Sequence, residues 1–220
     1  MSKARARKIK LLLFDVDGVM TDGSIWLFPA PAGANHGTKQ LREAVADQGG
    51  YSVSGSSMVE AKGFNAHDGT AFSLARLGGL KTGIITKRIS ETVALRARDL
   101  KIEYVYQGTQ DKLTAFAEIL KKEGIEADQA CFVGDDVIDL PVMRVCGLAV
   151  AVRNAREEVK DEADFITDHR GGDGAVRDVV EYVLKAQEKL DDCVEKYIAS
   201  RTPETAFGQS ARRKTKRVQG

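Results

Sequence analysis

The amino-acid sequence predicts an α/β fold, a doubly wound parallel sheet covered by helices on both faces. Three observations lead to this prediction. From residue 68 onward, short apolar segments alternate with segments of helical periodicity. The connections between these segments are short, as in sheets that alternate strand and helix. The chain has 220 residues, a length that suits one domain with a full hydrophobic core.

The expected strands are continuous apolar runs that end at charged or turn residues, the pattern of strands buried on both faces. The first is KIKLLLFDV at 8–16, and the second is LKTGIIT at 80–86. The later runs have the same character and lie at 102–106, 130–134, 147–152 and 163–167.

The expected helices have apolar residues at helical spacing, with start and stop signals. In the segment 68–79, Asp68 is the expected N-cap and a glycine pair is the stop. Residues 90–100 form a second amphipathic segment, and 110–124 a third that ends in lysines and a C-cap glycine. A short helical link follows the fourth strand, and one long closing helix is expected over 174–199.

A projecting β-hairpin interrupts the alternation. Its expected strands are 24–28 and 59–67, so that the hairpin spans 24–67. The stretch 29–57 between them is rich in Gly, Ala and Ser and has no sustained period. Such a stretch is typical of a functional lid or of a flexible, disordered insertion.

The last residues differ in composition from the rest. The stretch 201–220 is polar and basic, which favours a solvated, disordered tail over a nucleic-acid arm. We therefore expect a single domain over residues 1–200 that carries the hairpin, followed by this tail.

Composition limits the possible partners and location. The net charge of +1 gives no reason to expect nucleic acid or a membrane surface as a partner. The basic start leads into only about five apolar residues that end in acid, so a buried first strand is favoured over a secretory signal. Three cysteines without a CxxC pair are typical of reduced thiols, which makes the cytoplasm the expected location.

Polar residues gather at the carboxyl ends of the expected strands. Each follows a strand or opens the next helix: Asp15, Asp17, Thr86, Lys112, Asp135, Asp136 and Asp139. Singly, each has an ordinary explanation as a turn, cap or solvated residue. Together they crowd one rim, because neighbouring strands lie about 4.8 Å apart. Two carboxylates at 4 Å repel by about 4 kcal/mol at an effective dielectric of 20. Without a His/Cys cluster, this set favours a magnesium ion over zinc.

The first acidic pair indicates a chemistry. A period of two places Asp15 and Asp17 on one side of the strand end, and Gly18 lets the chain turn away. One carboxylate can hold the metal and attack a substrate while the other hands a proton to the leaving group. Thr86 could bond a transferred phosphoryl oxygen, and Lys112 could neutralise its charge. The pattern predicts phosphoryl transfer.

These motifs occur in an order that resembles a known superfamily. DVDGVMTDG, Thr86, Lys112 and GDD follow one another on their expected elements, as in the haloacid-dehalogenase superfamily of aspartate-nucleophile phosphatases. The segments FNAHDG, YQGTQDKL, VGDDVIDLPVM, GLAVAV and GGDGAVRDVVEYVL are similar to those of the 3-deoxy-D-manno-octulosonate 8-phosphate phosphatases. The resemblance covers 8–28 and 60–190 and implies hydrolysis of a phosphorylated acidic sugar through an aspartyl phosphate.

The resemblance also implies roles for the residues on the rim. Asp15 is the expected nucleophile and Asp17 the general acid and base, with Thr86 and Lys112 as the phosphate-holding pair. The implied ligands of the magnesium ion are Asp15 and Asp135 through their carboxylates and Asp17 through its backbone carbonyl. Asp136 and Asp139, the remaining acids of the GDDVID segment, are expected to orient the lysine or the metal's waters.

The expected substrate contacts are Gly18, Lys87, Arg88 and His67. Arg88 fits the family's arginine and would face the sugar acid's carboxylate. Lys87 stands where the family usually has glycine, and it either crowds the phosphate site or adds an anion contact. His67 stands where arginine or glutamine is frequent. It either faces the substrate or is an exposed strand-end histidine, and the second is favoured.

The spacing leaves no room for a large cap domain, because the stretches 87–111 and 113–134 are too short to hold one. Capless relatives form tetramers whose hairpins pack together over neighbouring active sites, so the resemblance implies a homotetramer. Trp26 and Phe64 are aromatic residues that such an assembly would cover, although local packing explains them equally well. The insertion 29–57 lengthens a hairpin that is normally tight.

Three other interpretations remain. A signalling receiver domain also uses strand-end acids, a threonine and a lysine around magnesium, but its acidic pair comes first in the chain, whereas GDD here follows the lysine. A phosphatase of another sugar acid, such as a sialic-type 9-phosphate, would use the same scaffold. A catalytically inactive assembly partner is the third, although every reactive residue is present.

Overall fold

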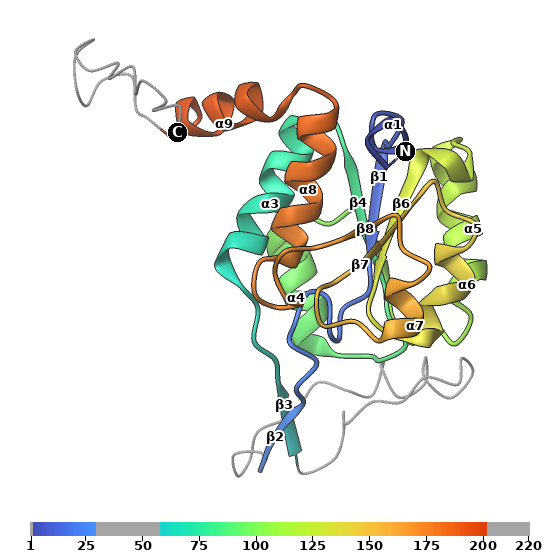
Figure 1. The fold of residues 1–220 in the computed structure, drawn as a ribbon. Coiled ribbons are helices and arrows are strands. Elements are labelled where there is room, and N and C mark those ends of the chain that lie inside the picture. The colour runs from blue at the N-terminus through green and yellow to red at the C-terminus, as the bar shows by residue number, and fades with distance from the viewer. Residues whose placement is uncertain (1, 30–57, 202–220) are drawn as a thin grey trace.

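The computed structural model describes residues 2–29 and 58–201, which form one central sheet with helices on both sides (Figure 1). The tip of the expected hairpin and nearly all of the expected tail lie outside these residues. All six strands of the sheet are parallel, in the order β5-β4-β1-β6-β7-β8. They are β1 Leu11–Phe14, β4 Lys81–Ile85, β5 Tyr104–Tyr106, β6 Ala130–Gly134, β7 Leu148–Ala151 and β8 Phe165–Ile166.

The strand order reverses direction at β1, which lies in the middle of the sheet. From β1 the chain moves outward to β4 and β5, and it then returns to β6 on the other side of β1. Phe14, the last residue of β1, is level with Ile84 of β4 and Val133 of β6. Ligands of open parallel sheets bind beyond the carboxyl ends of the strands at such a switch point.

The two faces of the sheet are covered by separate helix layers (Figure 1). On one face α3, Ala66–Leu77, packs against α8, Ala175–Ala186, and against α4, Glu91–Leu100. On the other face α5, Lys112–Glu123, packs against α6, Leu140–Met143. The sheet between them is apolar because its strands are buried on both sides, and all four residues of β1 are fully buried.

Three short helices were not expected from the sequence. They are α1 at Ser2–Ala6, which packs against α8, the single turn α7 at Glu157–Lys160, and the 3-10 turn η1 at Ala127–Gln129. None of the helices within 2–29 and 58–201 is both long and apolar enough to cross a bilayer.

The expectation of one long closing helix was wrong. The chain breaks after α8 and resumes as α9, Leu190–Ala199. At the break Glu188 adopts a left-handed conformation with φ 58°. The Gln187 amide donates to the Ile9 carbonyl at 2.7 Å, and the Lys189 ammonium donates to the Gly78 carbonyl at 3.1 Å. These contacts with distant segments turn α9 onto α3, an arrangement that helical periodicity does not reveal.

The expected N-cap of α3 was also wrong. The cap is Asn65, whose side chain accepts the amide of His67 at 2.7 Å. Asp68 lies buried in the first turn, where it accepts the amides of Gly174 at 3.2 Å and Arg177 at 2.9 Å. Asp68 therefore joins the start of α3 to the start of α8.

The projecting hairpin consists of β2, Trp26–Pro29, and β3, Met58–Ala61, in the described residues. The expected second strand over 59–67 was too long, because the chain leaves β3 after Ala61 and α3 begins at Ala66. The two strands are antiparallel and form a sheet of their own, with Trp26 opposite Ala61. The hairpin extends beyond the carboxyl ends of the central strands (Figure 1). The predicted fold class is confirmed: a doubly wound parallel sheet with a projecting hairpin and, in the described residues, no large cap domain.

Candidate active site

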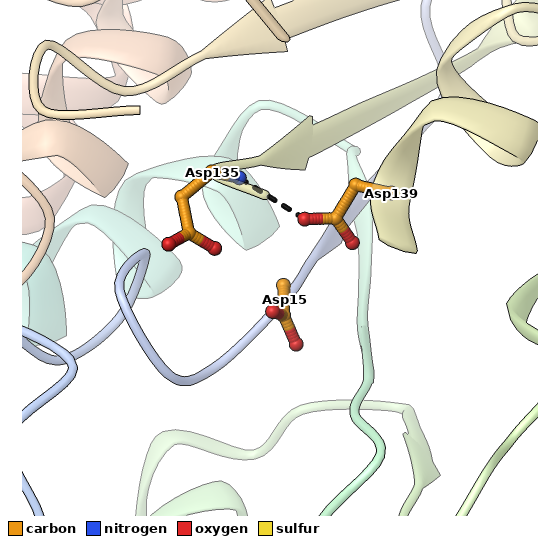
Figure 2. A group of neighbouring side chains, drawn as sticks. All are labelled: Asp15, Asp135 and Asp139. Atoms are coloured by element: carbon orange, nitrogen blue, oxygen red, sulfur yellow. Dashed lines mark hydrogen bonds between the residues drawn. The ribbon is translucent and has the colours of Figure 1, made fainter. Parts of the chain in front are cut away.

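Three aspartates meet at the carboxyl ends of β1 and β6. Asp15 directly follows β1, Asp135 directly follows β6, and Asp139 lies in the 3-10 turn η2, Val137–Asp139. Each offers a carboxylate oxygen, and these oxygens lie within 4.8 Å of one another (Figure 2). The pairing of β1 with β6 brings the first two together, as the strand-end pattern predicted.

Lys112, at the start of α5, supplies a positive charge to this cluster. Its side chain is buried, and its Nζ lies 2.9 Å from Asp15 Oδ1 and 2.7 Å from Asp139 Oδ1. The contact with Asp139 is a hydrogen bond. The contact with Asp15 is an ion pair without hydrogen-bonding alignment, so the buried Oδ1 of Asp15 lacks a hydrogen-bond partner among the described residues.

One lysine does not offset three carboxylates. Burial raises the pKa of Asp15 to about 7, with Lys112 acting in the opposite direction and Asp139 adding to the rise. Burial likewise raises the pKa of Asp135 to about 8, and the nearby charges of Asp15 and Asp139 add to it. Burial would lower the pKa of Lys112, but Asp15 and Asp139 outweigh it and hold that pKa above its ordinary value. The site therefore suits a further cation that binds oxygen ligands.

Asp139 is already committed to bonds within the protein. Its Oδ1 accepts from Lys112, and its Oδ2 accepts the amides of Asp135 at 3.0 Å and Asp136 at 3.3 Å. The backbone of Gly134 passes so closely that a Cβ there would lie 2.5 Å from the Asp139 Cβ. Asp139 thus fixes both the lysine and the loop after β6, and the carboxylates of Asp15 and Asp135 are left for a metal ion.

The turn after Asp15 is held between two other segments. Gly18 has φ 91°, and a Cβ on it would lie 2.1 Å from Asp135 Oδ2. On its other side a Cβ on Gly171 would lie 1.6 Å from the Gly18 carbonyl oxygen, and the Gly172 amide donates to the Val19 carbonyl at 3.0 Å. Glycines permit these approaches, so the turn has one well-defined position.

Thr86 lies at the same rim on the opposite side of β1 from Asp135. It directly follows β4 and is buried. Its amide donates to the Tyr106 carbonyl at 2.9 Å, and its carbonyl accepts the Thr109 amide at 3.1 Å. The backbone of Thr86 is therefore fixed next to the end of β1.

Comparison with known proteins agrees with this geometry. Residues 84–179 match the family model of the haloacid dehalogenase-like hydrolases. The 3-deoxy-D-manno-octulosonate 8-phosphate phosphatase KdsC of Escherichia coli strain K12 is 37% identical over 189 residues, which cover 86% of each chain. The chain belongs to the 3-deoxy-D-manno-octulosonate 8-phosphate phosphatase family of haloacid dehalogenase-like hydrolases.

Solved structures of this phosphatase family have the same fold. The Moraxella catarrhalis phosphatase, crystallised in complex with a magnesium ion, a phosphate ion and a KDO molecule, aligns with a TM-score of 0.73 and 33% identity over 89% of this chain and 97% of its own. The Yersinia pestis phosphatase aligns with a TM-score of 0.71 and 35% identity over 86% of this chain and 88% of its own.

Asp17, the second aspartate of the phosphatase motif, lies in a different environment from Asp15. Its Oδ1 is paired with Lys62, and its Oδ2 lies 3.6 Å from Arg88 Nε. The side chains of Asp15 and Asp17 therefore contact different sets of charges, whereas the strand period had placed them on one side. Lys87, between Thr86 and Arg88, is half-buried.

His67 lies away from these residues. It is exposed in the first turn of α3 and lines a cavity of about 330 Å³ together with His169, Arg177 and Glu181 of the α8 region. Within the described residues, His67 has no hydrogen bond or ion pair with Asp15 or Lys112. The expected exposure of His67 is confirmed, but its expected place at a strand end was wrong, because it lies in α3.

Two residues of the site were not singled out from the sequence. Glu60 lies in the hairpin strand β3 and Lys62 directly follows it, and they meet Asp17 and Arg88. Their alternate positions in a strand place both on one face. That spacing was visible in VEAKGF, but nothing local indicated that this face would meet the aspartate motif.

Proposed function

We propose that the protein is a magnesium-dependent phosphomonoesterase that hydrolyses 3-deoxy-D-manno-octulosonate 8-phosphate to the sugar acid and phosphate. The observation that carries this proposal is the cluster of Asp15, Asp135 and Asp139 around the buried Lys112 at the end of β1. The family's members with this name, and the relative that binds magnesium, phosphate and KDO, support the substrate and the cofactor.

In this proposal Asp15 is the nucleophile. A carboxylate oxygen of Asp15 attacks phosphorus and the bond from phosphorus to the sugar oxygen breaks. Asp17, which enters this step in its protonated form, gives its proton to that oxygen and becomes a carboxylate. Asp17 then removes a proton from a water molecule that attacks the aspartyl phosphate, which releases phosphate and restores Asp15. Thr86 and Lys112 hold the phosphoryl oxygens during both steps.

The proposed magnesium ligands are the carboxylates of Asp15 and Asp135 and the backbone carbonyl of Asp17. A bound magnesium ion would neutralise negative charge on the phosphoryl oxygens. Asp139 keeps Lys112 and the loop after β6 in place, because its oxygens are already bonded. Gly18, Lys87 and Arg88 are the proposed substrate contacts at the mouth of the site.

Asp15→Asn tests the nucleophile and Asp128→Asn is its matched control, because Asp128 is an exposed acid at the opposite end of the sheet. Both variants and the wild type are assayed with magnesium against the eight-carbon and a nine-carbon sugar acid phosphate, and circular dichroism checks the fold. We expect Asp15→Asn to lose turnover and Asp128→Asn to retain it. Activity in Asp15→Asn would identify a different nucleophile, and a higher kcat/KM for the nine-carbon compound would change the substrate.

We also propose that the protein is a homotetramer assembled through its hairpins. Residues 25–28 are consecutive large apolar side chains, and each is between 45% and 58% exposed. In a strand such residues point to both faces, and a two-stranded hairpin alone is only marginally stable in water. A second copy of the chain would cover this apolar surface.

Light scattering tests this assembly. The wild type should have the mass of four chains, and Trp26→Ser combined with Phe28→Ser should have a lower mass, because both side chains lie on one face of β2. Leu95→Ser, which removes an exposed apolar side chain of α4, is the control and should leave the mass unchanged. A monomeric wild type, or an unchanged mass in the hairpin variant, would contradict the proposal.

A further inference from the structure

The hairpin places a buried lysine next to Asp17. Lys62 directly follows β3, and its side chain is fully buried, with 0% exposed. Its ammonium is hydrogen-bonded to Asp17 Oδ1 and lies 3.8 Å from Glu60 Oε1. Burying an unpaired ammonium costs free energy of folding. Lys62 can therefore be buried here only because it is paired with Asp17.

The other oxygen of Asp17 faces a second cation. Arg88 Nε lies 3.6 Å from Asp17 Oδ2, and Arg88 Nη2 is hydrogen-bonded to Glu60 Oε2 at 2.6 Å. Lys62, Arg88, Asp17 and Glu60 thus form a connected group of two cations and two carboxylates. Within it, Lys62 makes the shorter contact with Asp17.

The strand that carries Lys62 is anchored to the main domain. The Glu60 carbonyl accepts the hydroxyl of Thr92 in α4 at 3.3 Å, and the Glu60 side chain holds Arg88 at the loop before α4. The position of Lys62 is therefore set by the base of the hairpin together with the β4–α4 connection, and Asp17 follows it.

We propose that Lys62 is a positioning residue for Asp17: the hairpin places its ammonium so that the carboxylate of Asp17 is held toward the oxygen of the leaving group. The inference rests on the proposed function, in which Asp17 transfers the proton to that oxygen. It assigns to the hairpin a part in the chemistry itself, in addition to any part in assembly.

The effect of losing Lys62 should depend on the leaving group of the phosphate ester. A sugar or other alkyl oxygen leaves poorly without a proton, so its departure depends on a correctly placed Asp17. A nitrophenolate leaves without a proton, so phosphoryl transfer from a nitrophenyl phosphate to Asp15 does not depend on Asp17. Loss of Lys62 should therefore affect alkyl phosphates and spare the nitrophenyl ester.

The experiment compares wild type, Lys62→Met, Lys62→Arg and Asp17→Asn on three substrates. These are 3-deoxy-D-manno-octulosonate 8-phosphate, a simple alkyl phosphate without a carboxylate, and p-nitrophenyl phosphate. The measured quantity is kcat/KM, which reports the steps up to formation of the aspartyl phosphate. Lys8→Met, which breaks the exposed Lys8–Asp128 pair at the far end of the sheet, is the matched control.

We expect Lys62→Met to lose about 10²-fold or more in kcat/KM on both alkyl phosphates and less than about tenfold on the nitrophenyl ester, as Asp17→Asn should. Lys62→Arg should recover part of the loss, Lys8→Met should show none, and Lys62→Met combined with Asp17→Asn should be no worse than Asp17→Asn alone. The retained nitrophenyl activity shows that the variant is folded.

Two results would overturn the inference while the proposed function stands. An equal loss on all three substrates would mean that Lys62 has only a structural role. A loss confined to the sugar acid phosphate would mean that Lys62 binds the substrate's carboxylate directly. A wild type inactive on every phosphomonoester would instead overturn the proposed function, and this inference with it. If Lys62→Met does not fold, Lys62→Gln gives the same comparison.

Discussion

Asp135→Asn should stabilise the metal-free protein at alkaline pH and abolish its stabilisation by magnesium. Asp135 is the acid with the greatest excess of like charge around it, because its carboxylate faces Asp15 and Asp139. Asparagine has nearly the same shape and no charge. The substitution therefore removes the repulsion and, with it, one proposed ligand of the metal.

The magnitude can be worked out from the distance between the carboxylates and from the pKa of Asp135. Two carboxylates 4.8 Å apart repel by about 3.5 kcal/mol at an effective dielectric of 20 and by about 0.9 kcal/mol in water. Burial, with the charges of Asp15 and Asp139 adding to it, raises the pKa of Asp135 from the ordinary 3.8 to about 8 in the folded protein. A carboxyl group with a raised folded pKa contributes stability that is fully present below pH 3.8 and is lost as the pH rises to about 8.

The loss amounts to about 1.4 kcal/mol per pH unit inside this window. The amide that Asp135→Asn introduces does not ionise, so the variant does not lose this stability. The free energy of unfolding of the variant minus that of the wild type should therefore increase by about 2–3 kcal/mol from about pH 6 to about pH 9. Urea unfolding in excess chelator measures this difference. Asp136→Asn, which alters an exposed neighbour in the same loop, should show a much smaller change.

Magnesium gives the second arm of this experiment. At a concentration a hundred times its dissociation constant, a ligand raises the free energy of unfolding by about 2.7 kcal/mol. The wild type and Asp136→Asn should show such a rise in magnesium, and Asp135→Asn should not. A pH-independent difference between wild type and Asp135→Asn, or an equal effect of magnesium on both, would refute the proposed electrostatics of the site.

Two further substitutions test the framework around the acids. Lys112→Met leaves Asp15 and Asp139 without their buried counter-charge, and we expect the free energy of unfolding in chelator to fall by about 3–5 kcal/mol; unchanged stability would mean that the lysine does not compensate them. Gly18→Ala strains a turn with φ 91° and displaces Asp135, so it should lose stability and also the thermal shift caused by magnesium. Gly124→Ala, with φ 64° and open space around it, should lose stability alone, and an equal magnesium response in both glycine variants would contradict the expected contact.

The acidic cluster could be predicted from the sequence because it depends on regular geometry. Asp15 and Asp135 each follow a buried apolar strand, and parallel strands that are neighbours place their ends side by side. The hydrogen bonds between the strands fix the distance between these ends, independently of the rest of the chain. Lys112 was found for a similar reason, because it opens a helix whose start lies at the same rim.

The features that were missed depend on contacts between segments far apart in the chain. The break between α8 and α9 forms where Gln187 and Lys189 bond to the backbone of Ile9 and Gly78. Asp68 was expected to cap its own helix, and it serves α8 instead. Helical periodicity is the same with or without these bonds, so the sequence pattern alone does not distinguish the alternatives.

The surroundings of Asp15 and Asp17 also depend on contacts between distant segments. They are separated by a single residue, and the local sequence does not indicate that their side chains have different surroundings. In the fold, Asp15 joins two other carboxylates around one ammonium, a group that is two positive charges short of neutrality. Asp17 and Glu60 meet Lys62 and Arg88, and these four side chains, among the residues that the structure describes, carry two charges of each sign.

A divalent cation is therefore needed on the Asp15 side and would be excessive on the Asp17 side. This imbalance supports the proposed roles, in which Asp15 attacks phosphorus beside the metal and Asp17 transfers the proton. Environments that differ between two neighbouring carboxyl groups are a general way to assign them different chemical roles. Here the difference is made by the hairpin, because Glu60 and Lys62 both come from it. In the proposed mechanism, the hairpin therefore helps to give the two aspartates different roles.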